Sequence, residues 1–444
     1  MPTAAQLKAV RSLIAATPDA ALGRLAAALG AGGEEFAPVL DIVLQEQMRR
    51  RTRQAAFAPV LPLFRARPDG VSTPVFPPSL LTGVWKALGE HCSPAMQVAT
   101  RDFELWEPDY DPAPETLNVL CREAARLLEE GLCGAEETGQ ARELALYFKL
   151  APLARLALAR LPDWLGKATE ERAAVLRLIF KDATSVCEDS APRLMEMVLG
   201  QLEEAALILR PISLLTDRAG DRYLADSELR GFGERILALA ERHVAGLKAF
   251  DPSGGAAAAH VAAAHARLAG DILAELEHSV DLSRDGPWGR RVAQSRQMIA
   301  GAIETRLREA EKAVEHALPM QEVRLTGRMT RPAPRLDAPP DPRFVEPARG
   351  LLTLLGETRH AAASGGFGAL RTQVAEALSE WLEIYADELV HMLNGGEARD
   401  PAVAHQYLEL AAEFLGCAEN PKAAQIVRRR AAVAGAGVPS QDVA

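Results

Sequence analysis

The sequence predicts an all-α protein, built either as a multi-helix bundle or as an irregular α-solenoid of antiparallel helix pairs. Apolar residues recur at spacings of three and four along most of the 444 residues, which places them on one face of an α-helix. Aromatic residues make up only 5%, so the core is built mainly from leucine, alanine, valine and isoleucine. Alanine and leucine are the strongest helix formers. The alternating β-branched and aromatic residues that mark strands do not recur.

The N-terminal helical region is expected over residues 1–103. Residues 3–66 hold three helical patterns, and the Pro-rich stretch 67–80 predicts a loop. The proline pair at 77–78 begins a short helix that runs to Gly89, because proline is well tolerated in the first helical turn.

The central helical domain is expected over residues 104–318. Its best-defined element follows the turn formers Asp285 and Gly286, where Trp288 opens a stripe of apolar residues that continues to Leu318. This long periodicity predicts one helix of more than thirty residues. Shorter helices are predicted near 114–128, 136–150, 190–209, 227–247 and 256–279. The apolar stretch 144–165 is expected to form a buried helix or a kinked pair, because two prolines interrupt it.

The stretch 319–343 is a Pro/Arg-rich linker in this interpretation, and it is the predicted domain boundary. Its prolines leave no room for a helix, although residues 323–330 could pair as a short strand. A smaller C-terminal helical domain is expected over 344–434, and a mobile tail over 435–444. The helices of this last domain are predicted near 344–356, 367–394, 400–416 and 420–434.

Composition narrows the class of protein. The formal net charge of −10 argues against a general nucleic-acid binder, because phosphate binding needs a basic surface. Five cysteines without C-x-x-C spacing predict neither a disulfide framework nor a zinc site. The stretch 144–165 carries too many charges and prolines for a membrane span. We therefore expect a soluble cytoplasmic protein, and its arginine- and alanine-rich composition indicates a GC-rich bacterial genome.

Two loops contain carboxylates that could hold a cation. Residues 217–228 resemble a calcium-binding loop, but Arg222 stands where such a loop needs glycine, so an ordinary turn between helices is expected. Glu107, Asp109 and Asp111 cluster in a second loop, where the neighbouring prolines keep them off a helix. The expected structure there is a solvated acidic loop.

No residues are predicted to be catalytic, to bind a cofactor or to ligate a metal. The chain has no phosphate-binding glycine motif, no nucleophile elbow and no H-E-x-x-H. His260 and His265 are five residues apart, which points their side chains about 140° apart around a helix. They are therefore expected to be structural and not to share one metal ion.

Arginine clusters are the remaining candidates for a binding role. They stand out against the acidic composition. Each could be a solvated helix end, or a docking site for an acidic protein partner, RNA or an anionic membrane. The predicted partner-binding residues are Arg49, Arg50, Arg51, Arg53, Arg428, Arg429 and Arg430.

The leading hypothesis is a non-enzymatic scaffold or adaptor that binds other proteins, with self-association as a further expectation. One alternative is an enzyme or small-ligand-binding protein whose site is assembled from the loops 104–112 and 216–228. Another is a nucleic-acid accessory protein that uses Arg49–Arg53.

Overall fold

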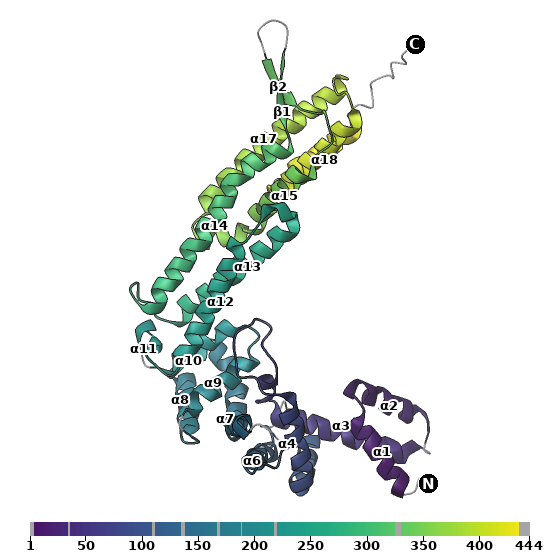
Figure 1. Cartoon of the computed structure of the whole chain (residues 1–444), viewed down its shortest axis with the longest axis vertical. Coiled ribbons are helices and arrows are strands. Elements are labelled where there is room, and N and C mark those ends of the chain that lie inside the picture. Colours follow the sequence, from purple (N-terminus) through teal and green to yellow (C-terminus); the bar gives the residue numbers. More distant parts are fainter. Residues whose placement is uncertain are drawn as a thin grey trace. The chain divides into compact units, whose positions relative to one another are not determined.

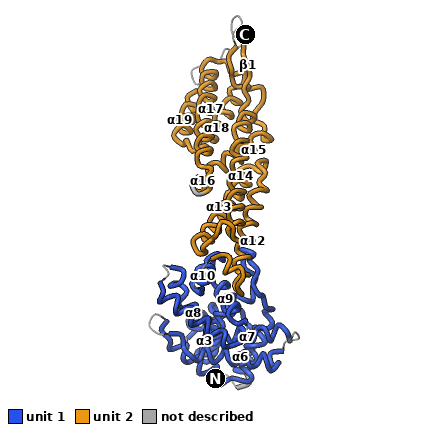
Figure 2. Tube along the Cα trace, turned by 90° about the vertical axis from the view of Figure 1, so that its left-hand side faces the viewer, with its two compact units in different colours: residues 1–219 blue, residues 220–444 orange. Residues whose placement is uncertain are grey.

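The computed structural model confirms the predicted all-α, multi-helix fold: it is 78% helical and carries one small two-stranded sheet. Two compact units divide the chain, residues 1–219 and 220–444 (Figure 2). The division therefore lies inside the segment predicted as one central domain. The predicted tail lies outside the described residues, which are 4–33, 36–108, 112–134, 138–166, 169–187, 189–216, 220–324 and 330–434.

Every regular element of unit 1 in the part that the structure describes is a helix (Figure 1). Its α-helices are α1 (Ala4–Ala16), α2 (Asp19–Ala31), α3 (Ala37–Phe57), α4 (Pro78–His91), α5 (Ser93–Glu104), α6 (Glu115–Glu129), α7 (Thr138–Leu165), α8 (Glu170–Thr184), α9 (Ser190–Gln201) and α10 (Leu209–Leu215). Two short 3₁₀ helices, η2 (Leu61–Phe64) and η3 (Ala205–Ile208), connect them.

The core of unit 1 forms where the C-terminal end of α3 meets α4, α6 and α7. Phe57 packs edge-on against Phe148 with ring centroids 4.9 Å apart, and against Trp85 at 5.9 Å. The apolar stripe predicted for α6 is buried, as Leu117 and Leu120 show. The stretch 144–165 lies within α7, which is one helix with two prolines inside it.

Arginine side chains close several helix ends in both units. The last carbonyl groups of a helix have no partner within it, and a guanidinium offers five N–H donors to satisfy them. Arg155 on α7 donates to the carbonyls of Ala55 and Ala56 near the end of α3, at 2.7 and 2.6 Å. Arg67 donates in the same way to Leu202 after α9, at 2.9 Å. Much of the arginine content thus has a structural use.

Unit 2 consists of longer helices and the one sheet (Figure 1). Its elements are α11 (Asp221–Ala225), α12 (Arg230–Lys248), the 3₁₀ helix η4 (Pro252–Gly254), α13 (Gly255–Ser279), α14 (Pro287–Ala317), β1 (Met320–Arg324), β2 (Thr330–Pro334), α15 (Pro342–Glu357), α16 (Arg359–Gly365), α17 (Gly368–Asn394), α18 (Pro401–Cys417) and α19 (Pro421–Val433).

Helix α14 matches the long helix predicted from Trp288, and its apolar stripe is buried. Trp288 packs where α12 has Gly233, and a Cβ atom at 233 would overlap the indole ring. The indole N–H donates to the carboxylate of Glu234 at 3.0 Å. Periodicity and local turn chemistry thus determined this helix, and the glycine on α12 gives its tryptophan room.

The stretch 319–343 differs from the predicted linker. Its first part forms an antiparallel hairpin of β1 and β2, and Ala333 and Pro334 of β2 are buried. Helix α15 then packs along α13 and α14, which joins the predicted C-terminal helices to the second half of the predicted central domain. This burial explains why the chain does not divide at 319–343, because proline-rich composition marks an absence of helix and does not report long-range packing.

Candidate protein-binding groove

The predicted arginine cluster lies on the second half of α3, where successive residues point about 100° apart. The four side chains therefore face different neighbours instead of forming one basic surface. Arg50 and Arg53 face other helices, whereas Arg49 and Arg51 are exposed.

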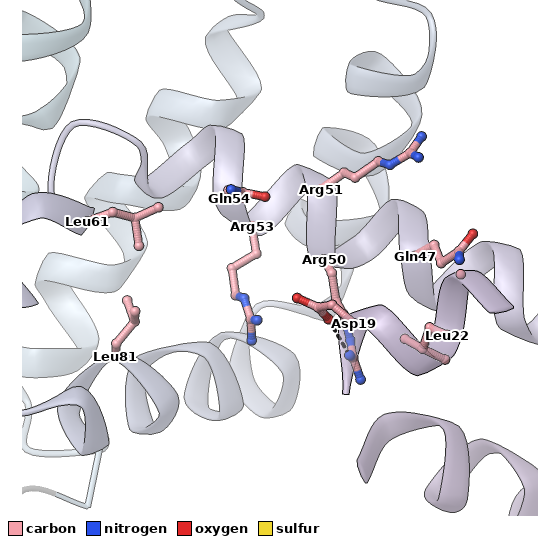
Figure 3. A pocket seen from close by; sticks show the side chains of 10 residues that line it. Asp19, Leu22, Gln47, Arg50, Arg51, Arg53, Gln54, Leu61 and Leu81 are labelled. Carbon is pink, nitrogen blue, oxygen red and sulfur yellow. Dashed lines mark hydrogen bonds and ion pairs between the residues drawn. The ribbon is translucent and has the colours of Figure 1, made fainter. Parts of the chain in front are cut away.

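Arg50 is engaged within the protein. Its guanidinium donates to the carbonyls of Thr17 and Ala15 at the end of α1, at 2.7 and 2.9 Å. It also pairs with Asp19 at 2.5 Å and with Glu46 at 2.9 Å, and Figure 3 shows the first of these ion pairs. These contacts make Arg50 the side chain that fastens α1 and α2 to α3.

Arg53 lies on the side of α3 that faces α4. Its guanidinium stands 5.4 Å from the centre of the Trp85 ring, a cation–π geometry. Burial and, after it, the charge of Arg50 lower the pKa of Arg53. A groove of about 470 Å³ opens beside it, and Figure 3 shows Arg53 between Asp19 on one side and Leu61 and Leu81 on the other.

A second and larger groove, of about 830 Å³, lies between α1, α3 and α5. We call it the α3–α5 groove. Its apolar surface comes from Leu44 and Met48 on α3 and from Met96 on α5. Met96 is buried, whereas 47% of Leu44 is exposed, so the groove offers apolar surface that no part of the described chain covers. Amphipathic helices of partner proteins bind in apolar grooves of this kind.

Arginines surround the α3–α5 groove. Arg49 is exposed and stands 3.6 Å from the half-buried Glu46, which makes a long ion pair. Arg11, Arg51 and Arg101 are also exposed, and within the described chain none of these three pairs with a carboxylate. Two acidic residues, Asp41 and Glu104, line the groove as well. The arginines outnumber them, so the groove is a local positive region on an acidic protein.

The second predicted cluster, on α19, is largely neutralised within unit 2. Arg428 pairs with Glu409 on α18 at 2.9 Å, and Arg430 pairs with Asp387 on α17. Arg429 lies between them on the exposed face. These contacts hold α19 against its neighbours.

The loop 216–228 serves a structural purpose where it is described. Asp221, the fifth position of the calcium-like pattern, is buried in α11. Its carboxylate accepts from the backbone N–H of Gly289 at 3.2 Å and of Ser283 at 3.4 Å, near the start of α14. A carboxylate suits a helix N-terminus because it satisfies free N–H groups and complements the helix dipole. Residues 217–219 lie outside the described chain.

The loop 104–112 is described only in part, because residues 109–111 lie outside the described chain. Helix α5 ends at Glu104, and Phe103 and Trp106 pack with ring centroids 5.7 Å apart. Asp109 and Asp111 lie outside the described residues, so the predicted acidic cluster stays a prediction. Within the described chain, no group of three histidine, cysteine or carboxylate side chains could hold a metal ion.

The structure places His260 and His265 in separate contacts, one of which the sequence did not predict. His260 stands 3.4 Å from Glu357, and His265 does not face it. Instead the Nδ1 atoms of His265 and of His243 on α12 lie 2.9 Å apart. Sequence spacing could not show this pair, because the two residues meet only when α12 packs on α13.

Arg126 lies near the Cys92 thiol and Arg155 near the Cys121 thiol, but burial outweighs the effect of both charges on the thiol pKa. Burial raises the pKa of the Cys121 and Cys133 thiols to about 11, which keeps both protonated near neutral pH. All five cysteines are free thiols. No helix of the described chain has the length and apolarity that a membrane crossing requires.

Arg11, Arg101 and the apolar residues of the α3–α5 groove were not among the predicted binding residues. They belong to three different helices, so no sequence pattern brings them together. No known family model, curated protein or solved structure matches the chain.

Proposed function

We propose that this chain is a non-enzymatic helical scaffold of the bacterial cytoplasm, which binds an acidic amphipathic helix of a partner protein in the α3–α5 groove. The observation that carries the proposal is the combination of exposed apolar surface at Leu44 with three unpaired arginines around it. The five free thiols suit a reducing compartment.

Charge and shape both favour an acidic helix as the occupant. Leucines spaced at three and four residues would cover Leu44 and Met48, while glutamates beside them would reach the arginines of the rim. Elsewhere most arginines already meet a carboxylate of the chain, as Arg428 meets Glu409. A partner that brings carboxylates would complete the same pattern at the groove.

A nucleic acid fits the groove less well than a protein. Asp41 and Glu104 line it, and both would repel a phosphate backbone. Its walls carry no aromatic ring on which a base could stack. The nucleic-acid alternative therefore becomes an outcome of the test.

The first experiment uses a defined probe: a fluorescent peptide of leucines at helical spacing with glutamates elsewhere, and a counterpart with lysines in place of the glutamates. Fluorescence anisotropy with the full chain should show salt-dependent binding of the acidic peptide only. The triple variant R11E/R51E/R101E should weaken binding at least about tenfold, which corresponds to ~1.4 kcal/mol.

The matched control reverses three exposed arginines of unit 1 that do not line the groove, R24E/R65E/R142E, and leaves the net charge change the same. Equal loss in the two triple variants would show that only overall charge matters, and the groove proposal would fail. Tighter binding of a single-stranded oligonucleotide than of the acidic peptide would favour the hypothesis of a nucleic-acid accessory protein.

A photo-crosslinking residue at Leu44 then identifies the natural partner in an extract of the source organism. We expect the crosslinked peptide to belong to an acidic, amphipathic helix, and the crosslink to disappear in the R11E/R51E/R101E background. A crosslink that persists in that background would contradict the proposal.

A further inference from the structure

The hairpin of β1 and β2 has one protected edge and one open edge. Opposite residues of an antiparallel ladder alternate between hydrogen-bonded and non-hydrogen-bonded pairs. Arg335 N–H donates to the Pro319 carbonyl at 2.8 Å, which makes that pair a hydrogen-bonded one. Pro332 lies opposite Glu322 in the same register. It has no N–H to donate, which agrees with a non-hydrogen-bonded pair there.

This alternation determines which backbone groups point out of the hairpin. On β2 the outward positions are Thr330, Pro332 and Pro334. The two prolines lack N–H groups, and β2 also packs against α17. Prolines at an edge prevent a further strand from pairing there. The outer edge of β2 is therefore closed.

The outer edge of β1 has no such protection. The backbone N–H and C=O groups of Met320, Glu322 and Arg324 point away from β2, and none of these three residues is proline. Glu322 and Arg324 are exposed, and neither forms an ion pair within the described chain. An open strand edge of this kind is a template for pairing with another strand.

We propose that β1 pairs antiparallel with β1 of a second copy of this chain, about a two-fold axis at Val323. In this register Glu322 lies opposite Arg324 of the partner subunit, and Arg324 lies opposite Glu322 of the partner subunit. Both pairs are of the hydrogen-bonded kind, because the outward-pointing residues of each strand face each other. The inference is independent of the α3–α5 groove.

The charges of Glu322 and Arg324 favour a second copy of β1 as the paired strand, and they favour the register centred on Val323. Shifting the two strands by two residues places Glu322 opposite Glu322 of the partner subunit, or Arg324 opposite Arg324 of the partner subunit. Like charges directly opposite each other destabilise a strand pair, whereas opposite charges stabilise it. The Glu-Val-Arg sequence of β1 is thus complementary to itself in the centred register.

Sedimentation velocity of the full chain over a range of concentrations tests the proposal. We expect a reversible monomer–dimer equilibrium, weak because the interface is small. E322R places arginine opposite arginine at both pairs, and R324E places glutamate opposite glutamate. Each variant alone should dimerise at least about tenfold more weakly than the unchanged chain.

An equimolar mixture of E322R and R324E should dimerise again, because one copy then presents two arginines to two glutamates of the other. This recovery also shows that both variants are folded. R290E, which reverses an exposed arginine on α14, should leave dimerisation unchanged. A chain that stays monomeric up to about 1 mM, or variants that dimerise like the unchanged chain, would overturn the proposal.

The backbone pairing has a separate test. E322P removes an outward N–H and leaves the β1–β2 ladder intact, as Pro332 does on the other strand, whereas E322A removes only the charge. We expect E322P to abolish the dimer and E322A to weaken it. Equal effects of the two variants would refute the strand pairing.

Discussion

Substituting Arg155 by methionine should loosen the packing of α7 on α3. The guanidinium donates to the carbonyls of Ala55 and Ala56 at 2.7 and 2.6 Å, and its Nε–H donates to the side-chain oxygen of Asn118 at 3.0 Å. Arg155 is half-buried, and burial lowers the pKa of its guanidinium. Methionine retains the apolar stem but supplies no donor.

The magnitude follows from the partners that remain. The carbonyl of Ala56 keeps a second donor in the Cys121 thiol at 3.2 Å, so the carbonyl of Ala55 and the Asn118 oxygen bear most of the loss. A hydrogen bond to a charged group contributes ~1.5–3 kcal/mol, and part is regained because a partly buried charge is removed. We expect a net loss of about 2–3 kcal/mol.

Urea-dependent hydrogen exchange of amides at the C-terminal end of α3 is the appropriate assay, because it reports on this region without assuming that both units unfold together. R160M is the matched control on the same helix. Arg160 is exposed, and its ion pair with Asp163 is long, at 3.7 Å. Such a surface pair contributes at most ~1 kcal/mol. If R155M and R160M lower protection equally, the guanidinium does not cap α3 and the reasoning is wrong.

Two further predictions concern unit 2. Burial, and after it the charges of His265 and Arg242, lower the pKa of His243. The unfolded chain therefore binds a proton there more readily, so unit 2 should lose stability as pH falls below about 6.5, and H243Q should flatten that dependence in urea titrations at several pH values. G233A should destabilise unit 2 by ~1–3 kcal/mol, because the new Cβ displaces the ring of Trp288. Urea-dependent hydrogen exchange of the α12 and α14 amides measures this, and unchanged protection would show that the ring moves aside at little cost.

Helix by helix, the sequence was informative wherever local rules decide the structure. Gly286 and the proline after it begin α14, and the stripe from Trp288 to Val314 is buried along its length. The boundaries predicted for α17 and α18 lie within a residue of the observed ones. Periodicity and turn residues act over a few positions, so the fold class and most helices could be predicted from them.

The candidate groove could be predicted only in part. Arg49 and Arg51 do line it, but Arg50 fastens α1 instead, and Arg101 comes from another helix. Which of several neighbouring arginines reaches a distant carbonyl depends on how helices cross, and no local pattern encodes that. The strand register of β1 and β2 and the His243–His265 pair depend on packing in the same way.

By itself the sequence determined that the chain is helical and where the long helices α14, α17 and α18 begin and end. Only the tertiary structure decided which arginines donate to the carbonyls at helix ends and which stay unpaired around the α3–α5 groove. The physical reason is that a helix exposes free carbonyls at its end wherever it stops, and the side chain that satisfies them is chosen by proximity in space. Arg155 lies 100 residues from Ala55 along the chain, and only the packing of α7 on α3 brings the two together.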